Sequence, residues 1–387
     1  MWNDADTSYM RRALQLAALG LYTTTPNPRV GCVIVKENHI IGEGWHRKSG
    51  EPHAEPLALA DAHNRGFNPR GATMYVSLEP CRHHGRMPPC TQAIIESGVR
   101  RVVAACADPN PLAARGGKIL QDAGISFELG LLEQDARELN RGFISRMRRN
   151  RPWVRSKIAA SIDGRIALRD GRSQWITGES ARADGHRDRA SSCAILTGVG
   201  TVVTDDPSLT VRAVETSRQP LRIVLDSQAQ TPLHSRLMQD GGDTLIVTAQ
   251  SRPQNWNSHI HYLHLPAHGK NGHYATNDLN ALMSLFAQRE INELHVEAGG
   301  RLNGALLEAG LLDEMICYLS PRILGQNARA MFETDRALTS LDDFADFSFF
   351  RTCNIGDDLR IELRHKKTVE ENKCSQVSSP PSARYAH

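Results

Sequence analysis

The chain has 387 residues, of which 40% are hydrophobic and 23% are charged, and its formal net charge is +3. This size and composition predict two globular domains with sizeable cores, and the small net charge argues against a nucleic-acid-binding protein. No stretch reaches the roughly 20 apolar residues that span a bilayer, and the N-terminus lacks the pattern of a signal peptide. The eight cysteines follow no disulfide-framework spacing, so we expect a reduced, cytoplasmic enzyme.

The first 150 residues alternate between strand and helix patterns. Apolar residues at helical spacing predict a first helix that Thr7 or Ser8 caps, and a hairpin follows across residues 36–39. The remaining elements that we expect are helices at 53–62, 89–97, 117–123 and 133–149, and strands at 74–78, 101–106 and 125–129. This alternation predicts a three-layer α/β domain over residues 1–150.

Arg151-Pro152 marks the predicted boundary to a second α/β domain, residues 151–365. There we expect strands at 153–160, 194–197, 222–226, 244–248, 293–297 and 314–319, helices at 279–288 and 302–309, and terminal strands within 343–364. Residues 366–387 have no apolar periodicity and predict a disordered tail. We interpret the basic run 146–151 as a helix end that leads into a linker rather than as a nucleic-acid contact.

His53, Cys81 and Cys90 supply an imidazole and two thiols, and Glu55 adds a carboxylate. Three protein ligands leave one tetrahedral position of Zn²⁺ for a water, whose pKa the metal lowers to about 7. Nucleobase deaminases combine such ligands with a Glu that moves protons. Eight residues separate the cysteines instead of two, so a structural zinc site completed by His83 or His84 is the alternative. A structural site has no use for Glu55.

The segments around these ligands resemble the deaminase half of the bifunctional riboflavin-biosynthesis deaminase/reductase family, which has the same long insert between its cysteines. The matching segments are 25–28, 30–31, 42–44, 46, 50–55, 78–81 and 88–90. The resemblance implies a cytidine-deaminase-like domain, with Asn27 at the pyrimidine edge and His46, His83 and Arg86 near the ribose phosphate. The sequence departs from the family at Arg82, Met87 and Pro56-Leu57, none of which is a predicted ligand.

Two glycine clusters follow predicted strands of the second domain, at 197–201 and 297–304. The second cluster precedes a helix, whose first N–H groups suit a pyrophosphate, although an ordinary tight turn also explains it. No Gly-x-Gly-x-x-Gly follows a strand, so a Rossmann site is not indicated. Segments 157–165, 173–177, 200–212 and 296–299 resemble the reductase half of the same family, which is similar in fold to dihydrofolate reductase and uses NADPH.

The resemblance also implies the residues of this second site. Cofactor contacts are expected from Ala159, Trp175, Thr201, Asp205, Gly299, Gly300, Arg301, Leu302 and Asn303. Substrate contacts are expected from Ser173, Arg189, Leu209, Arg212 and Glu297. Lys157 and Asp205 are the ionisable groups that we expect to deliver a proton, and Arg222 and Ser227 are candidates for reading the 2′-phosphate of NADPH.

We therefore predict a bifunctional enzyme of riboflavin biosynthesis that binds Zn²⁺ and NADPH. Its first domain would deaminate diaminohydroxyphosphoribosylaminopyrimidine, and its second would reduce the ribosyl group of 5-amino-6-(5-phosphoribosylamino)uracil to ribityl. We expect a small pyrimidine ribonucleotide as substrate, neither nucleic acid nor membrane as partner, and a homo-oligomer, a dimer or larger. One alternative is another nucleoside deaminase fused to an oxidoreductase. The other is a zinc-stabilised binding protein without catalysis, and the presence of Glu55 beside His53 argues against it.

Overall fold

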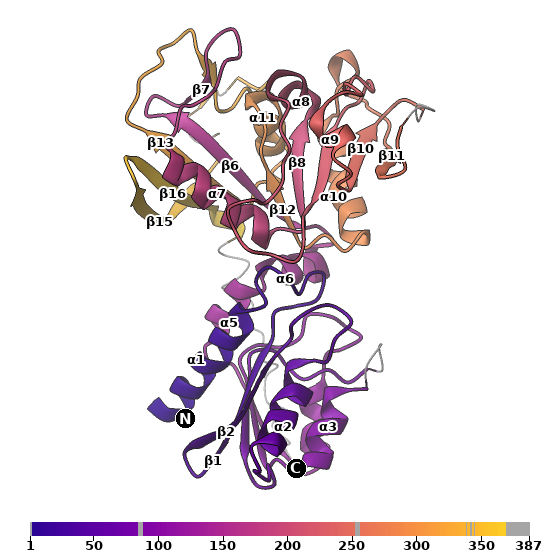
Figure 1. Ribbon diagram of the computed structural model, residues 1–387, viewed down its shortest axis with the longest axis vertical. Helices are drawn as coiled ribbons and strands as arrows, with labels where there is room; N and C mark the ends of the chain where they lie inside the picture. The colour runs from indigo at the N-terminus through magenta and orange to yellow at the C-terminus, as the bar shows by residue number, and fades with distance from the viewer. Residues whose placement is uncertain are drawn as a thin grey trace, which may run out of the picture.

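The computed structural model describes residues 2–83, 88–251, 256–337, 339–340, 343 and 345–368. These residues form two halves stacked along the longest axis, with helix α6 (Arg141–Arg149) between them (Figure 1). The described part of each half combines a sheet with helices, so the predicted α/β class is confirmed for both.

The first half is built on a five-stranded sheet of order β2-β1-β3-β4-β5. Its strands are β1 (Gly31–Lys36), β2 (His39–Trp45), β3 (Thr73–Val76), β4 (Arg101–Ala104) and β5 (Ser126–Leu129). The helices are α1 (Asp4–Ala18), α2 (Ala54–Asn64), α3 (Cys90–Ser97), α4 (Gly116–Asp122) and α5 (Glu133–Leu139). Alternate residues of β1 face opposite ways: Cys32 and Ile34 pack with α2, α3 and α4, while Val33 and Val35 pack with α1 and α5. Two helical layers therefore enclose the sheet, as predicted.

Two local predictions for this half are wrong. Asn3, not Thr7 or Ser8, caps α1, because its side chain accepts from the N–H of Asp6 while the Asp6 carboxylate accepts from the N–H of Asn3. The helix expected over 133–149 is divided into α5 and α6 at Asn140. The buried Asn140 side chain pairs with both backbone groups of Arg29, at 2.8 and 2.9 Å.

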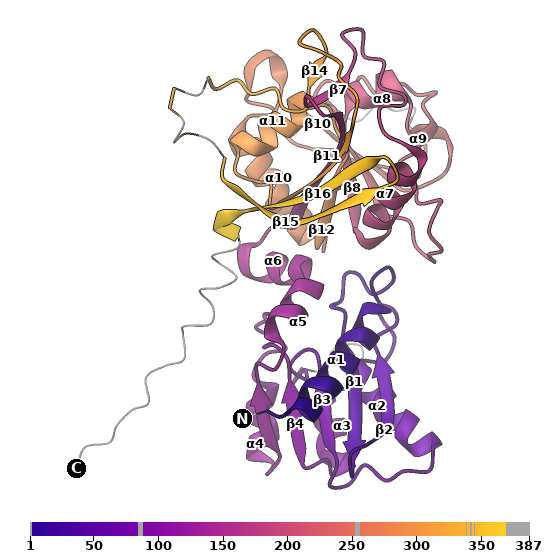
Figure 2. The same ribbon diagram turned by 90° about the vertical axis from the view of Figure 1, so that its left-hand side faces the viewer.

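The second half contains a nine-stranded sheet of order β11-β10-β9-β8-β12-β6-β13-β16-β15, and only β15 and β16 run antiparallel to their neighbours. Its strands are β6 (Trp153–Ser161), β8 (Ala194–Gly198), β9 (Leu221–Leu225), β10 (Thr244–Thr248), β11 (Ile260–His264), β12 (Glu293–Val296), β13 (Glu314–Ser320), β15 (Phe347–Ile355) and β16 (Asp358–His365). Strands β7 (Arg165–Ala167) and β14 (Arg329–Ala330) form a separate pair. Figure 2 shows the β15–β16 hairpin along one side of this half.

Helices cover both faces of the larger sheet. They are α7 (Glu179–Ser191), α8 (Val199–Asp205), α9 (Arg236–Gln239), α10 (Thr276–Gln288) and α11 (Gly300–Glu308). Leu196, Val296 and Leu245 pack against α10 and α11, while Ile195 and Val224 pack on the other face with residues of α8 and α9. The sequence did not predict α7, α8, α9, β7, β11 or β14.

Residues 366–368 form a helical turn, and the Thr368 hydroxyl donates to Asp313, so the predicted tail begins too early. The rest of that tail, 369–387, lies outside the described residues. Among the helices that the structure describes, none has the length and apolar character needed to cross a membrane.

Candidate active sites

The ends of three elements bring His53, Cys81 and Cys90 together. His53 is the N-cap of α2, Cys81 follows β3, and Cys90 is the first residue of α3. Their ligand atoms lie within 4.8 Å of one another, and His53 Nδ1 is 3.2 Å from Cys90 Sγ and 3.6 Å from Cys81 Sγ. Hydrogen bonds from Cys90 and His53 outweigh burial and lower the pKa of Cys81 to about 4. One imidazole and two sulfurs at this spacing suit a tetrahedral Zn²⁺ with an open position.

Glu55 lies in the first turn of α2 and is 3% exposed. Burial raises the pKa of its carboxyl, and the neighbouring His53 opposes that shift. Among the described residues His83 is not part of the metal-ligand group, and His84 lies outside them, as does the predicted phosphate ligand Arg86. The three described ligands beside a buried carboxylate favour a catalytic over a structural site.

Asn27 and His46, both predicted substrate residues, contact each other. The Nδ2 of Asn27 is 3.1 Å from Nε2 of His46, whose Nδ1 is 3.0 Å from the carbonyl oxygen of Pro52. The carbonyl can only accept, so Nδ1 carries the proton and Nε2 accepts from Asn27. Burial lowers the pKa of His46, which fits this neutral tautomer. The His46 ring stands edge-on to that of His53, with centroids 5.4 Å apart.

The sequence did not single out Asp108, which follows β4 and is buried. Burial and the charges of Glu79, Cys81 and Glu55 raise its pKa to about 7. Glu79 accepts hydrogen bonds from the N–H groups of Asp108 and Gly117, so it ties the loop after β4 to the segment that carries Cys81. The position of Asp108 after a buried parallel strand is the signal that could have identified it.

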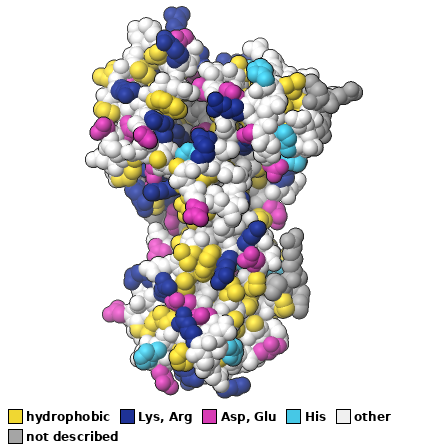
Figure 3. All heavy atoms as spheres, in the orientation of Figure 1, with side chains coloured by type: hydrophobic (Ala, Val, Ile, Leu, Met, Phe, Trp, Pro, Cys, Tyr) yellow, Lys and Arg dark blue, Asp and Glu magenta, His cyan; other side chains and the backbone are white. Residues whose placement is uncertain are grey.

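A cavity of about 830 Å³ opens in the second half, where the larger sheet meets α7, α8 and α11. The space-filling view shows Lys and Arg side chains gathered around a hollow in this half (Figure 3). All the proton-donor, cofactor and substrate residues predicted for the second site line the cavity except Asn303. They are Lys157, Ala159, Ser173, Trp175, Arg189, Thr201, Asp205, Leu209, Arg212, Glu297, Gly299, Gly300, Arg301 and Leu302.

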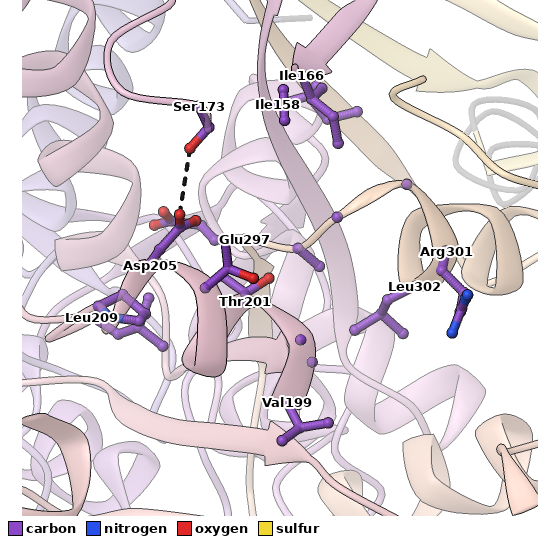
Figure 4. A pocket seen from close by; sticks show the side chains of 18 of the residues that line it. Ile158, Ile166, Ser173, Val199, Thr201, Asp205, Leu209, Glu297, Arg301 and Leu302 are labelled. Carbon is purple, nitrogen blue, oxygen red and sulfur yellow. Dashed lines mark hydrogen bonds between the residues drawn. The ribbon is translucent and has the colours of Figure 1, made fainter. Parts of the chain in front are cut away.

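Ser173, Asp205 and Glu297 lie on one side of this cavity. The Ser173 hydroxyl donates to Asp205 at 3.4 Å, and Figure 4 shows this pair near Glu297, with Arg301 and Leu302 across from them. Burial raises the pKa of Asp205 and lowers that of Lys157, whose Nζ lies 5.6 Å from the ring centroid of Tyr318. Both shifts favour the neutral forms, which suits groups that exchange protons.

Arg189 and Glu297 form a bidentate ion pair in the cavity wall, at 2.5 and 2.9 Å. The Arg189 charge outweighs burial and holds the pKa of Glu297 well below its usual range. His186, which the sequence did not single out, accepts from the N–H of Arg212, and burial together with Arg189 lowers its pKa to about 4. This part of the wall therefore combines the Glu297 carboxylate with the guanidinium groups of Arg189 and Arg212.

The glycines of the two clusters differ in the space that a side chain would find. A Cβ at Gly200 or Gly299 would meet nothing within 4 Å, although both residues line the cavity. A Cβ at Gly304 would lie 1.8 Å from the carbonyl oxygen of Glu333, so packing alone requires that glycine. Open backbone at Gly200 and Gly299, the latter capping α11, fits a closely approaching dinucleotide phosphate.

Two predicted contacts lie behind the cavity. Asn303 is fully buried, and its amide bonds to Ser156, Ala298 and Met331, so it holds the loop in place. Arg222 is 2% exposed, pairs with Asp240 at 2.7 Å and does not line the cavity, whereas the other 2′-phosphate candidate, Ser227, does.

Two family models match the chain. The first is the cytidine and deoxycytidylate deaminase zinc-binding region, over residues 3–106, and the second is the RibD C-terminal domain, over residues 152–361. The riboflavin biosynthesis protein RibD of Escherichia coli K12 is 47% identical over 372 residues, which cover 92% of this chain and 99% of the relative. That of Haemophilus influenzae is 44% identical over 379 residues, with coverage of 94% and 99%.

Solved structures show the same likeness. Acinetobacter baumannii RibD superimposes with a TM-score of 0.84 at 40% identity, over 93% of this chain and 99% of that one. A Thermotoga maritima protein described as a diaminohydroxyphosphoribosylaminopyrimidine deaminase/5-amino-6-(5-phosphoribosylamino)uracil reductase gives the same TM-score at 32% identity and the same coverage.

Proposed function

Because the chain belongs to the RibD family of riboflavin biosynthesis proteins, we propose that it performs two successive reactions. The first half deaminates diaminohydroxyphosphoribosylaminopyrimidine, and the second reduces 5-amino-6-(5-phosphoribosylamino)uracil with NADPH. The observation that carries the proposal is that one chain holds a His/Cys/Cys group beside the buried Glu55 and, separately, a cavity walled by Lys157, Arg189 and Glu297. We assign the two reactions to domains 1–150 and 151–365.

In the deaminase, Zn²⁺ held by His53, Cys81 and Cys90 supplies an activated water when it is bound. Glu55 would take one proton from that water and pass it to a ring nitrogen while the hydroxide adds to the ring carbon. It would then take the second proton, from the hydroxyl group now on that carbon, and give it to the leaving amine as the C–N bond breaks. Asn27 donates through Nδ2 to His46, which leaves its amide oxygen to accept from the pyrimidine edge. His83 and Arg86 complete the proposed contacts to the ribose phosphate.

In the reductase, NADPH supplies the hydride when it is bound. Opening of the ribosyl ring leaves an oxygen that needs a proton, and Lys157 is the proposed donor, because its lowered pKa weakens its hold on that proton. Asp205 is the second candidate, on the side of Ser173. The Arg212 side chain is exposed, and within the described residues its guanidinium bonds through Nη1 to Thr210, so it suits the substrate phosphate.

The remaining contacts in the cavity are divided between cofactor and substrate. Cofactor contacts are assigned to Ala159, Trp175, Thr201, Asp205, Ser227 and the segment 299–303, in which Asn303 acts through its backbone. Substrate contacts are assigned to Ser173, Arg189, Leu209, Arg212 and Glu297. Trp175 is 60% exposed at the rim, and the guanidinium of Arg182 lies 4.4 Å from its ring centroid. We also propose a cytoplasmic homo-oligomer, a dimer or larger, on the strength of the family and the cysteine spacing.

One assay tests both reactions. The zinc-loaded chain is given the diaminopyrimidine nucleotide with and without NADPH, and ammonia and NADPH are followed separately. We expect ammonia without NADPH, and NADPH oxidation that lags behind ammonia release. Oxidation of NADPH that precedes ammonia release would contradict the order of reactions, and a zinc-loaded chain that releases no ammonia would contradict the deaminase assignment.

A further inference from the structure

The segment Thr25–Arg29, which carries Asn27, lies against the second half of the molecule. The carbonyl oxygen of Pro26 accepts a hydrogen bond from Nδ2 of Asn292 at 2.9 Å and a longer one from Nη2 of Arg146 at 3.4 Å. Asn292 immediately precedes β12, in the reductase half. The peptide that joins Pro26 to Asn27 is therefore held by a residue that lies 266 positions further along the chain.

The Asn292 side chain has only one orientation that satisfies its neighbours. Its Oδ1 accepts from Nε of Arg146 at 2.6 Å, and a guanidinium can only donate, so Nδ2 must face Pro26. The side chain is 5% exposed, and its own backbone N–H points to the sulfur of Cys193 at 3.2 Å. Arg146 belongs to the basic run that the sequence predicts as a helix end, and its hydrogen bond to Oδ1 holds the Asn292 amide in this orientation.

Further contacts hold both ends of the segment. The Thr25 hydroxyl lies 2.8 Å from the Cys193 sulfur. At the other end, Arg29 donates through Nη1 to Glu293 at 2.8 Å, and through Nη2 to the carbonyl oxygen of Ser191 at 3.2 Å. Cys193, Glu293 and Ser191 all belong to the reductase half. By contrast, the bond that the Asn27 side chain itself makes within the described residues is the one to His46.

We propose that Asn292 is a positioning residue for deamination: the reductase half orients the peptide from which Asn27 meets the pyrimidine. The inference rests on the proposed function, in which Asn27 contacts the substrate. Among the described residues, Asn292 belongs neither to the metal-ligand group nor to the lining of the reductase cavity, so its proposed effect on deamination passes through the Pro26–Asn27 peptide. The deaminase site is therefore complete only when the second half is docked against it.

The loss of one neutral hydrogen bond sets the expected effect. Without Nδ2, the hydrogen bond that the Pro26 carbonyl keeps within the described residues is the 3.4 Å contact with Arg146, and the Asn27 peptide can tilt. A bond of this kind corresponds to about a 2- to 12-fold change in an equilibrium constant. We expect the KM for the diaminopyrimidine to rise by about that factor while kcat per zinc stays within about twofold, because the reacting groups are untouched.

The experiment compares the full-length, zinc-loaded chain with Asn292→Ala and Asn292→Asp. The second variant keeps the size of the side chain and the bond to Arg146 but places an oxygen against the Pro26 carbonyl, so it remains informative if the Ala variant does not fold. Asn257→Ala is the matched control, since Asn257 bonds to a carbonyl oxygen, that of Met238, elsewhere in the reductase half. Ammonia release, NADPH oxidation with the deaminated intermediate, and zinc content are measured for each.

We expect both Asn292 variants to raise the deamination KM, to keep one zinc per chain and to oxidise NADPH with wild-type kinetics, while Asn257→Ala changes none of these. Two folded Asn292 variants with the wild-type deamination KM would overturn the inference. A parallel loss of NADPH oxidation would also overturn it, because it would show general damage. A wild-type chain that releases no ammonia would instead refute the proposed function, and the premise with it.

Discussion

Gly299 allows the cofactor assignment to be tested without disturbing the fold. It caps α11 with φ −75° and ψ 174°, an extended conformation open to any residue, and a Cβ there would meet no protein atom within 4 Å. Gly299→Ala reduces the conformational entropy of the unfolded chain, worth about 0.4–1 kcal/mol, and replaces a fair N-cap by a poor one at a similar cost. The free energy of unfolding should therefore change by less than about 1 kcal/mol.

The effect on NADPH should be much larger. A methyl group forced into a filled contact costs about 1–3 kcal/mol, which corresponds to a rise of roughly 5- to 150-fold in the KM for NADPH. The assay measures NADPH oxidation at a saturating level of the deaminated substrate, with ammonia release from the same sample as internal reference. Gly304→Ala is the contrasting variant: its Cβ collides with the Glu333 carbonyl, so its melting temperature should fall. An unchanged KM for NADPH in Gly299→Ala would refute the reasoning.

Further predictions concern the first half. Glu55→Gln should keep zinc and oxidise NADPH when given the deaminated intermediate, but should release ammonia about 10²- to 10⁴-fold more slowly; a loss within about threefold would exclude Glu55 as the proton carrier. Cys81→Ser or Cys90→Ser should lose zinc, by atomic absorption, and with it deamination; stoichiometric zinc in the double variant would contradict the ligand assignment. Burial raises the pKa of the Asp6 carboxyl, but hydrogen bonds, including that from Arg101, outweigh burial and lower the pKa from its ordinary 3.8 to about 2. This carboxylate thus stabilises the fold above about pH 4, a contribution lost as the pH falls towards 2. Acid unfolding of Asp6→Asn should depend less steeply on pH across that window.

The metal site could be predicted because its signal is local. Residue type and the flanking segments indicate His53, Cys81 and Cys90 as candidate ligands, and the structure brings them together near the ends of elements that periodicity also predicts. Strand patterns likewise gave most of the sheet, since the core-facing residues of β1 and β8 are apolar whichever helix covers them. These features depend on a few neighbouring residues, so they can be predicted from the sequence.

Other features depend on partners far along the chain. Asn140 divides a helix because its amide pairs with Arg29, 111 residues earlier, and nothing in the helical periodicity of 133–149 indicates that pair. Arg222 carries a charge that can bind a phosphate, but its guanidinium donates instead to Asp240 and to the carbonyl oxygens of Ser208 and Leu237. The charge of a side chain indicates which groups it can bind, but its partners in the folded protein depend on which residues pack around it.

The alternation of charged and apolar residues along β12 and just after it does not indicate which charged residues contact the other half and which line the cavity. Glu293, His295 and Glu297 alternate with apolar residues, which ordinarily indicates a strand with one solvated face. Here that face is covered: Glu293 pairs with Arg155 at 3.3 Å, Glu297 pairs with Arg189, and His295 is fully buried, with Nε2 3.2 Å from Glu297. Removing one partner from such a buried pair is costly, because it leaves a buried charge without compensation. Four residue steps, roughly 13 Å, therefore separate Glu293, which pairs with Arg29 of the first half, from Glu297, which we assign to the reductase substrate.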